Sequence, residues 1–239
     1  MNQGIYPLAA SMINQVNRLD QISNNLANVN TNGFKQEGTT ETTFNYYLER
    51  MQNENKMPSK INTVTNNVPK IDSKFINSEM GPVVMTGNTL DFALNKPDTF
   101  FKIQNSKGDI VYSRDGAFKN LDNFLVDGNG NNVLNANNEP IAIEDDFESQ
   151  IGVSKISYEN LEKIGDNTYL AKNNNEIENL ENNDNQIVQG AIEKSNVNSV
   201  TAMVELIDAH RRFEQSQKAV KTIDELNAGL IEKIGSNTK

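Results

Sequence analysis

The chain has 239 residues, of which 36% are hydrophobic and 7% aromatic, and it contains neither tryptophan nor cysteine. This length can hold one or two domains with a real core. The lack of cysteine excludes disulfides and thiolate chemistry. The net charge is −10 and the basic residues are scattered, which argues against nucleic-acid binding because that needs a concentrated basic surface.

The start of the chain lacks the basic segment and apolar run of a cleavable signal peptide. No stretch approaches the roughly 18 consecutive apolar residues that cross a bilayer. We therefore expect a chain that does not span a membrane, and composition alone would place it in the cytoplasm.

The first predicted element is an amphipathic helix over residues 5–29. Apolar residues recur at alternating spacings of three and four, with Gln15 as the one polar member, which predicts a stripe that packs against a helical partner. Pro7 falls in the first turn, where proline is tolerated. Asn32-Gly33 is expected to end the helix because glycine reaches the left-handed C-cap conformation. The stripe comprises Ile5, Leu8, Met12, Leu19, Ile22, Leu26 and Val29.

The middle of the chain has a different texture. A short helix is expected around Phe44–Met51, followed by a polar, asparagine- and lysine-rich stretch to about Ser78. Short apolar or alternating runs separated by turn signals then predict a β-rich domain. "TFFKIQ" and "DIVYSR" are expected to form a hairpin around Ser106–Gly108, and "FLVDGNGNNVLN" two strands around a Gly/Asn turn. Asn173–Asn185 is polar and of low complexity, which predicts a mobile loop.

A second heptad helix is predicted at the C-terminus. "SNVNS" (Ser195–Ser199) precedes it and is rich in residues that cap helix N-termini. Ser216 and Asn227 interrupt its apolar stripe, and Val200, Val204 and Ile207 widen the beginning of the stripe. The stripe itself comprises Leu206, Ala209, Phe213, Val220, Ile223, Leu230 and Ile234.

These elements predict an α+β fold in which the two terminal helices pair as a coiled-coil-like layer around a central β-rich domain. The expected parts are a helix and turn (1–40), a short helix with a polar linker (41–82), the β-rich domain (83–190) and the C-terminal helix (191–239). Pairing the ends within one chain closes a loop of about 160 residues, at roughly 4–5 kcal/mol. Ordering of the helices on assembly is therefore favoured.

No arrangement of residues predicts an active site, a cofactor site or a metal site. His210 is the only histidine, so a His-based triad or metal cluster lacks a second anchor. "DGNGN" (Asp127–Asn131) imitates the start of a calcium loop but lacks the required Gly and Glu further on, which favours a hairpin turn. The acidic run Glu144–Glu148 is expected to be solvated. We therefore expect that the protein is not an enzyme.

Three stretches, in chain order, resemble signatures of the bacterial flagellar rod and hook family. "SNNLANVNTNGFK" (Ser23–Lys35) is similar to the N-terminal signature, "SRDGAFKNLDNFLVDGNGNNVL" to a hairpin region of the β domain, and "EKSNVNSVTAMVELIDAHRRFEQSQKAV" to the C-terminal signature. Arg211–Glu214 reads Arg-Arg-Phe-Glu, which resembles proximal rod members, whereas distal ones usually carry Arg-Ala-Tyr-Glu. Asn95–Thr99 departs from the Gly-rich turn of the distal members.

The resemblance implies a structural subunit whose terminal helices form the inner tubular layer of the periplasmic rod. It also implies export through the flagellar type III apparatus without a cleaved signal, and assembly with other rod subunits. The expected assembly interface adds amide-rich and turn residues at both ends to the apolar stripes. It comprises Ile5, Leu8, Met12, Leu19, Ile22, Asn25, Leu26, Ala27, Asn28, Val29, Gly33, Phe34, Asn196, Val197, Asn198, Leu206, Phe213, Val220, Ile223 and Leu230.

Three alternatives remain open at this stage. The first is a distal rather than a proximal rod subunit. The second is a wall-acting enzyme, which would need a spaced carboxylate pair in a cleft. The third is a free coiled-coil binding module, which would form a defined small oligomer.

Overall fold

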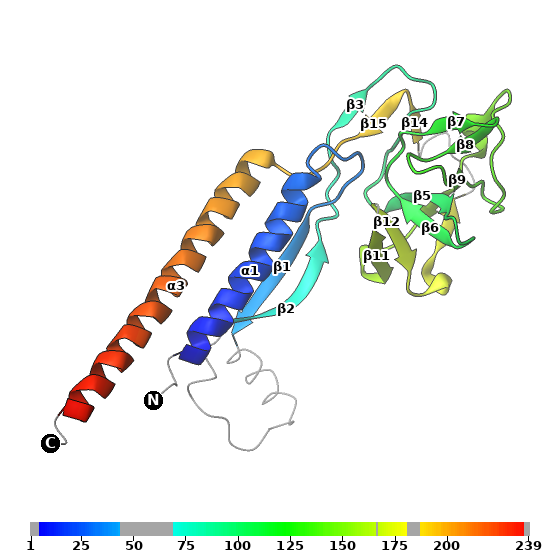
Figure 1. Ribbon diagram of the computed structural model, residues 1–239. Coiled ribbons are helices and arrows are strands. Elements are labelled where there is room, and N and C mark those ends of the chain that lie inside the picture. The colour runs from blue at the N-terminus through cyan, green and yellow to red at the C-terminus, as the bar shows by residue number, and fades with distance from the viewer. Residues whose placement is uncertain (1–4, 44–68, 166, 181–186, 237–239) are drawn as a thin grey trace. The chain divides into compact units, whose positions relative to one another are not determined.

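The computed structural model describes residues 5–43, 69–165, 167–180 and 187–236 (Figure 1). The short helix expected around Phe44–Met51 lies outside these residues. The chain divides into two compact units. The first comprises residues 1–26, 37–75 and 199–239, and the second comprises residues 27–36 and 76–198.

The first unit contains the two terminal helices, α1 (Ile5–Ala27) and α3 (Ser199–Ser236), which pack against each other. Together with the antiparallel strands of the second unit they confirm the α+β class. The predicted stripes are the less exposed faces of both helices. On α1, Gln15 and Ile22 are buried and Leu8, Met12, Leu19 and Leu26 are half-buried. On α3, Ala202 and Ala209 are buried and Leu206, Phe213, Val220 and Ile223 are half-buried.

The end of α1 differs from the expectation. The helix ends at Ala27 and the chain then turns through Asn28–Gly33, so the predicted role of Gly33 as helix C-cap is wrong. Gly33 does adopt a left-handed φ of 66°. That conformation serves the turn after the helix and not the helix end.

The first unit also contains a two-stranded ribbon of β1 (Glu37–Thr43) and β2 (Pro69–Ile76), where the sequence predicted a turn and a linker. "EGTTETT" has no apolar alternation, so the usual strand signal is missing. The side chain of Phe75 on β2 covers Gly38 on β1, where any Cβ would fall 2.1 Å from the ring. Any larger residue at this position would require the exposed Phe75 ring to move.

The second unit is built from short antiparallel strands (Figure 1). A nine-stranded sheet has the order β11-β12-β6-β5-β9-β8-β7, with β10 pairing both β5 and β13, and two ribbons pair β14 with β4 and β15 with β3. The strands are β3 (Val83–Met85), β4 (Phe92–Leu94), β5 (Thr99–Gln104), β6 (Ile110–Ser113), β7 (Lys119–Leu121), β8 (Phe124–Val126), β9 (Asn132–Val133), β10 (Val153–Lys155), β11 (Leu161–Gly165), β12 (Thr168–Ala171), β13 (Glu178–Leu180), β14 (Ile187–Gln189) and β15 (Ala191–Glu193).

Both predicted hairpins are confirmed. β5 and β6 pair in register Ile103↔Val111 around the predicted turn, and β8 and β9 pair through Val126↔Asn132. The loop expected at 173–185 is wrong for its described central part. Glu178–Leu180 forms β13, which pairs with β10, and Asn179 Oδ1 accepts a hydrogen bond of 2.9 Å from Ser154 Oγ.

Aromatic side chains dominate the core of the second unit. One buried cluster is centred on Phe92, Phe101 and Phe118, and a second contains Phe100, Tyr112 and Tyr169. Ring centroids 5.1–6.1 Å apart, with T-shaped or tilted planes, give these rings contact energy beyond their burial. Among the described residues, neither helix is apolar enough over a sufficient length to cross a membrane.

Candidate functional site

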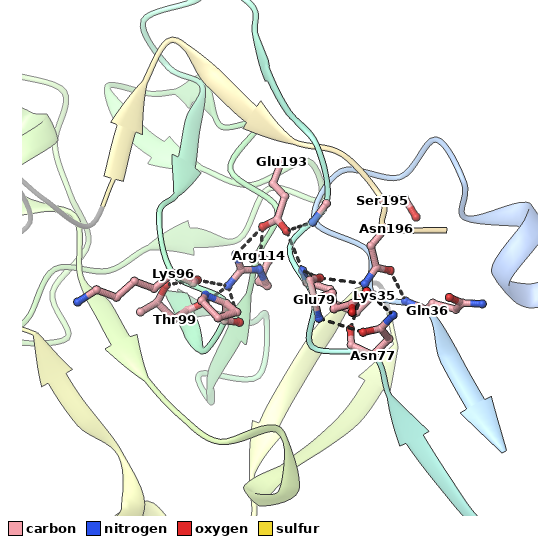
Figure 2. A network of polar contacts seen from close by, with 12 residues as sticks. Lys35, Gln36, Asn77, Glu79, Lys96, Thr99, Arg114, Glu193, Ser195 and Asn196 are labelled. Atoms are coloured by element: carbon pink, nitrogen blue, oxygen red, sulfur yellow. Dashed lines mark hydrogen bonds and ion pairs between the residues drawn. The ribbon is translucent and has the colours of Figure 1, made fainter. Parts of the chain in front are cut away.

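Three charged side chains meet in the interior of the second unit, and we refer to Lys35, Arg114 and Glu193 as the polar clasp (Figure 2). The Lys35 ammonium donates to Glu193 Oε1 at 2.7 Å, and Arg114 Nε donates to Glu193 Oε2 at 2.8 Å. All three side chains are fully buried. Burial and the nearby Arg114 guanidinium lower the pKa of Lys35, while the Glu193 carboxylate opposes that shift. A buried charge set of this kind persists only when each member is paired.

Backbone groups provide further hydrogen-bond partners for the polar clasp. Arg114 Nη1 donates to the carbonyls of Lys96, Pro97 and Thr99 at 2.6–3.0 Å. The backbone N–H of Gly81 donates to Glu193 Oε1 at 2.8 Å. Lys35 also donates to the carbonyl of Glu79. The clasp therefore joins five segments that are far apart in the sequence.

The segment after α1 and the segment before α3 are paired directly within the second unit. The Gly33 N–H donates to the Glu193 carbonyl at 2.7 Å, and the Asn196 N–H donates to the Phe34 carbonyl at 3.3 Å. The Asn196 carboxamide accepts from the Gln36 N–H at 2.7 Å. It also donates to the carbonyl oxygen of Glu79 at 2.9 Å (Figure 2).

Gly33 has a steric as well as a conformational reason to be glycine. A Cβ at this position would lie 2.4 Å from the carbonyl carbon of Arg114. The backbone of the turn thus passes directly against the backbone that carries the Arg114 guanidinium. Only glycine allows this approach together with a left-handed φ.

Amides of the N-terminal signature likewise bond within the subunit. Asn25 is buried, and its carboxamide accepts from the Glu37 N–H at 3.0 Å and donates to the Glu37 carbonyl at 2.8 Å, as a neighbouring strand would. The Thr31 hydroxyl donates to Asn28 Oδ1 at 3.1 Å. These contacts fix the start of β1 to α1 and stabilise the turn after α1.

The structure separates the residues of the expected assembly interface into groups. Ile22, Asn25, Gly33, Phe34 and Val197 are buried. Among the remaining stripe residues whose side chains the structure describes, Leu230 is exposed and the others are half-buried. The side chain of Ile5 lies outside that description. Ala27 and Asn198 are exposed, whereas Asn28, Val29 and Asn196 are intermediate.

The prediction that Val200, Val204 and Ile207 widen the stripe of α3 is wrong, because these side chains are 53–69% exposed whereas Ala209 of the stripe is buried. They belong to a second apolar face, and each helix has such a face outside the expected interface. On α3 it consists of Val200, Met203, Val204 and Ile207, which are 51–69% exposed, and on α1 it consists of Ile13 and Val16. We refer to these six residues as the outer stripe. The spacing of three and four residues from Val200 to Ile207 was the signal available in the sequence.

The structure also places the residues that were considered for chemistry. His210 is exposed on α3, 3.6 Å from Glu214 one turn further on. The Asp127 carboxylate accepts from the backbone N–H groups of Asn129 and Asn131 at 2.8 Å, so it stabilises the predicted hairpin turn. Glu144, Asp145 and Asp146 are exposed, as expected of a solvated run.

The structure combines a compact β unit with two long helices that expose apolar side chains. Exposed apolar faces of this kind are typical of proteins that assemble with other subunits. Residues 6–35 match the family described as "Flagella basal body rod protein", residues 96–156 match "Flagellar hook protein FlgE/F/G D1 domain", and residues 188–232 match "Flagellar basal body rod FlgEFG protein C-terminal". Each matched segment supplies one member of the polar clasp.

Relatives match along almost the whole chain. The flagellar basal-body rod protein FlgG of Agrobacterium fabrum is 30% identical over 94% of this chain and 96% of its own. FlgF of Caulobacter vibrioides is 30% identical over 98% and 99%, and the hook-basal body complex protein FlhO of Bacillus subtilis is 26% identical over 98% and 99%. The chain belongs to the flagellar basal-body rod protein family. It is a structural subunit of the basal-body rod, which corrects the cytoplasmic location that composition alone suggested.

Proposed function

We propose that this subunit occupies the proximal part of the rod and assembles with neighbouring rod subunits through the outer stripe. One observation carries the proposal: large apolar side chains such as Val200 and Val204 are 69% and 62% exposed, whereas most of the other apolar face of α3 is half-buried or buried. A contiguous exposed apolar face marks an interaction site, because its contact with water is unfavourable.

The residues of the expected interface divide into two roles in this proposal. The half-buried stripes, including Leu19, Phe213 and Ile223, hold the two helices of one subunit together. The exposed residues, including Leu230 and the outer stripe, contact neighbouring subunits. Asn25, Gly33, Phe34, Asn196 and Val197 act indirectly, by fixing the segments from which the helices start.

The proximal position is supported by Arg211–Glu214. Arg211, Arg212 and Glu214 are exposed on α3 and only Phe213 points into the half-buried stripe. Three charged side chains on this turn would face neighbours or solvent, so the motif can distinguish rod positions. A distal position is the alternative, since the relatives include proteins named FlgG as well as FlgF.

We further propose that the subunit reaches the rod through the flagellar type III export apparatus and that it has no catalytic activity. The rod family is structural, and the single histidine is an exposed residue on α3. A wall-digestion assay on purified protein tests the second point, since measurable digestion would contradict it.

Val204→Asp tests the assembly surface. The added carboxylate would be buried in a subunit contact at a cost of several kcal/mol, repeated at every subunit. The matched control is Gln217→Asp, which adds the same charge at an exposed polar position of α3. We expect the Val204→Asp strain to export soluble subunit but to lack rods and motility, with the control strain unaffected. Normal rods containing Val204→Asp subunits would overturn the proposal.

A further inference from the structure

We infer that the polar clasp is a lock that joins the two ends of the chain inside the second unit, so that α1 and α3 are brought together by the folding of the β domain. This goes beyond assembly through the outer stripe, because it concerns the free subunit. It rests on the buried ion pairs of Glu193 and on the pairing of residues 33–36 with residues 193–196.

The lock removes most of the entropic cost of pairing the helices. In an unfolded chain, α1 and α3 are separated by the whole of residues 28–198. Once Gly33 is bonded to Glu193, only residues 28–32 lie between α1 and the lock, and only residues 194–198 lie between the lock and α3. Short connectors of this kind give the two helices a high effective concentration. Loop closure is therefore achieved by the second unit and not by the helix stripes.

Through Glu193, the folding of the second unit and the docking of the two chain ends depend on each other. Its Oε1 atom accepts from Lys35 and Gly81, and its Oε2 atom accepts from Arg114. Lys35 belongs to the segment after α1, whereas Glu193 belongs to β15, just before α3. A buried charge left without its partner is strongly unfavourable. The interior of the second unit is thus complete only when both ends of the chain are docked.

Lys35→Met tests the lock in a second unit that remains folded. Methionine fills the buried space without charge, and Glu193 keeps its bonds to Arg114 and Gly81, so the second unit still folds. The matched control is Lys102→Met. Lys102 is an equally buried lysine of the same unit, but it donates to the Ala136 carbonyl and Asn138 Oδ1 and touches neither chain end.

Amide hydrogen exchange on the full-length subunit measures the lock directly. We expect the Gly33 amide, which donates to Glu193, to exchange about 100-fold faster in Lys35→Met than in the unmodified chain and at an unchanged rate in Lys102→Met. The Gly152 amide, which donates to Leu134, reports the domain and should change less than about threefold in Lys35→Met. An unchanged Gly33 rate in Lys35→Met, or equal acceleration at Gly152, would overturn the inference.

A second measurement needs no change in the clasp. Because the chain has no cysteine, spin labels at Ser23→Cys and Met203→Cys, both exposed, report only the distance between the ends of α1 and α3 nearest the lock. We expect a narrow distance distribution that broadens at the same urea concentration at which the second unit unfolds. A distribution that stays narrow after the second unit has unfolded would show that the helices pair without the lock.

Discussion

In the second unit the charged side chains of Lys35, Arg114 and Glu193 are buried and paired, whereas in the first unit Val200, Val204 and other apolar side chains of α3 lie in solvent. The second unit therefore pairs its buried charges within one chain. The first unit leaves an apolar face of α3 in solvent, and contact between such a face and water is unfavourable. We therefore expect the β domain to fold as a monomer and neighbouring subunits to cover this face of α3.

The largest effect is expected from removing the central carboxylate of the second unit. Glu193→Ala leaves the Lys35 and Arg114 cations buried without a counter-charge, which should cost about 3–5 kcal/mol of unfolding free energy. Urea unfolding followed by tyrosine fluorescence measures this. The matched control is Glu178→Ala, which removes an exposed ion pair with Lys155 at 3.7 Å and should cost about 0–1 kcal/mol. Equal costs for the two variants would mean that the clasp does not stabilise the unit.

The next effect concerns the turn that carries Lys35. Gly33→Ala places a side chain on a residue with left-handed φ, and its Cβ would lie 2.4 Å from the Arg114 backbone. We expect the free energy of unfolding to fall by about 2–4 kcal/mol. Gly130→Ala is the control, since Gly130 also has a positive φ but nothing within 4 Å of its Cβ position. It should cost only about 1 kcal/mol. Similar midpoints for the two variants in urea would show that the close approach at Gly33 is unimportant.

The helices and hairpins were predictable because their signals are local. The 3-4 spacing of Leu206, Ala209 and Phe213 describes one helix face, and the turn at Ser106–Gly108 lies between two apolar runs. β1 and β2 were missed because their backbone is held by distant groups, such as the Asn25 carboxamide on Glu37, and not by apolar alternation.

The polar clasp could not be found from local patterns. Lys35 and Glu193 are 158 positions apart, and nothing near either one indicates the other. The one trace in the sequence is a charged residue directly beside buried apolar residues, as in Phe34-Lys35 and Ile192-Glu193. Such a residue is usually a surface position, so burial had to be seen before pairing could be inferred. The signature asparagines were assigned to assembly from the sequence, and the structure pairs two of them, Asn25 and Asn28, with groups of the same subunit.

A smaller effect with a defined pH dependence is expected at Asp115. Burial is the main cause that raises the pKa of this carboxyl above its ordinary value of 3.8, and the charges of Asp127 and Asp91 raise it further. The folded state therefore binds this proton more readily than the unfolded state. The contribution of Asp115 to stability rises as pH falls through the raised pKa and levels off below 3.8.

Asp115→Asn tests that assignment. Asparagine keeps an acceptor for the Ala117 N–H, which lies 3.1 Å from Asp115 Oδ1, and removes the charge of this half-buried side chain. We expect stabilisation of less than about 1 kcal/mol at pH 7 that shrinks at pH 4.5, measured as urea midpoints. Asp145→Asn, at an exposed position, should change neither midpoint. A gain that is larger at pH 4.5 would reverse the sign and contradict the burial of this carboxylate.

The smallest effect is expected at His210, which is exposed on α3 directly after the buried residue Ala209. His210→Ala removes an exposed imidazole whose nearest charge is Glu214 at 3.6 Å, so unfolding free energy should change by no more than about 0.5 kcal/mol, with normal rods and motility. Ala209→His places the same imidazole on the covered face, where Ala209 is only 2% exposed, and should cost about 1–3 kcal/mol through overpacking. Helical circular dichroism of the subunit and motility of the strain measure both variants. Because the two positions differ only in the face they occupy, this pair tests which side of α3 its own subunit covers. Loss of motility in His210→Ala with the rod intact would instead indicate that the imidazole has a chemical role, and would reopen the enzyme alternative.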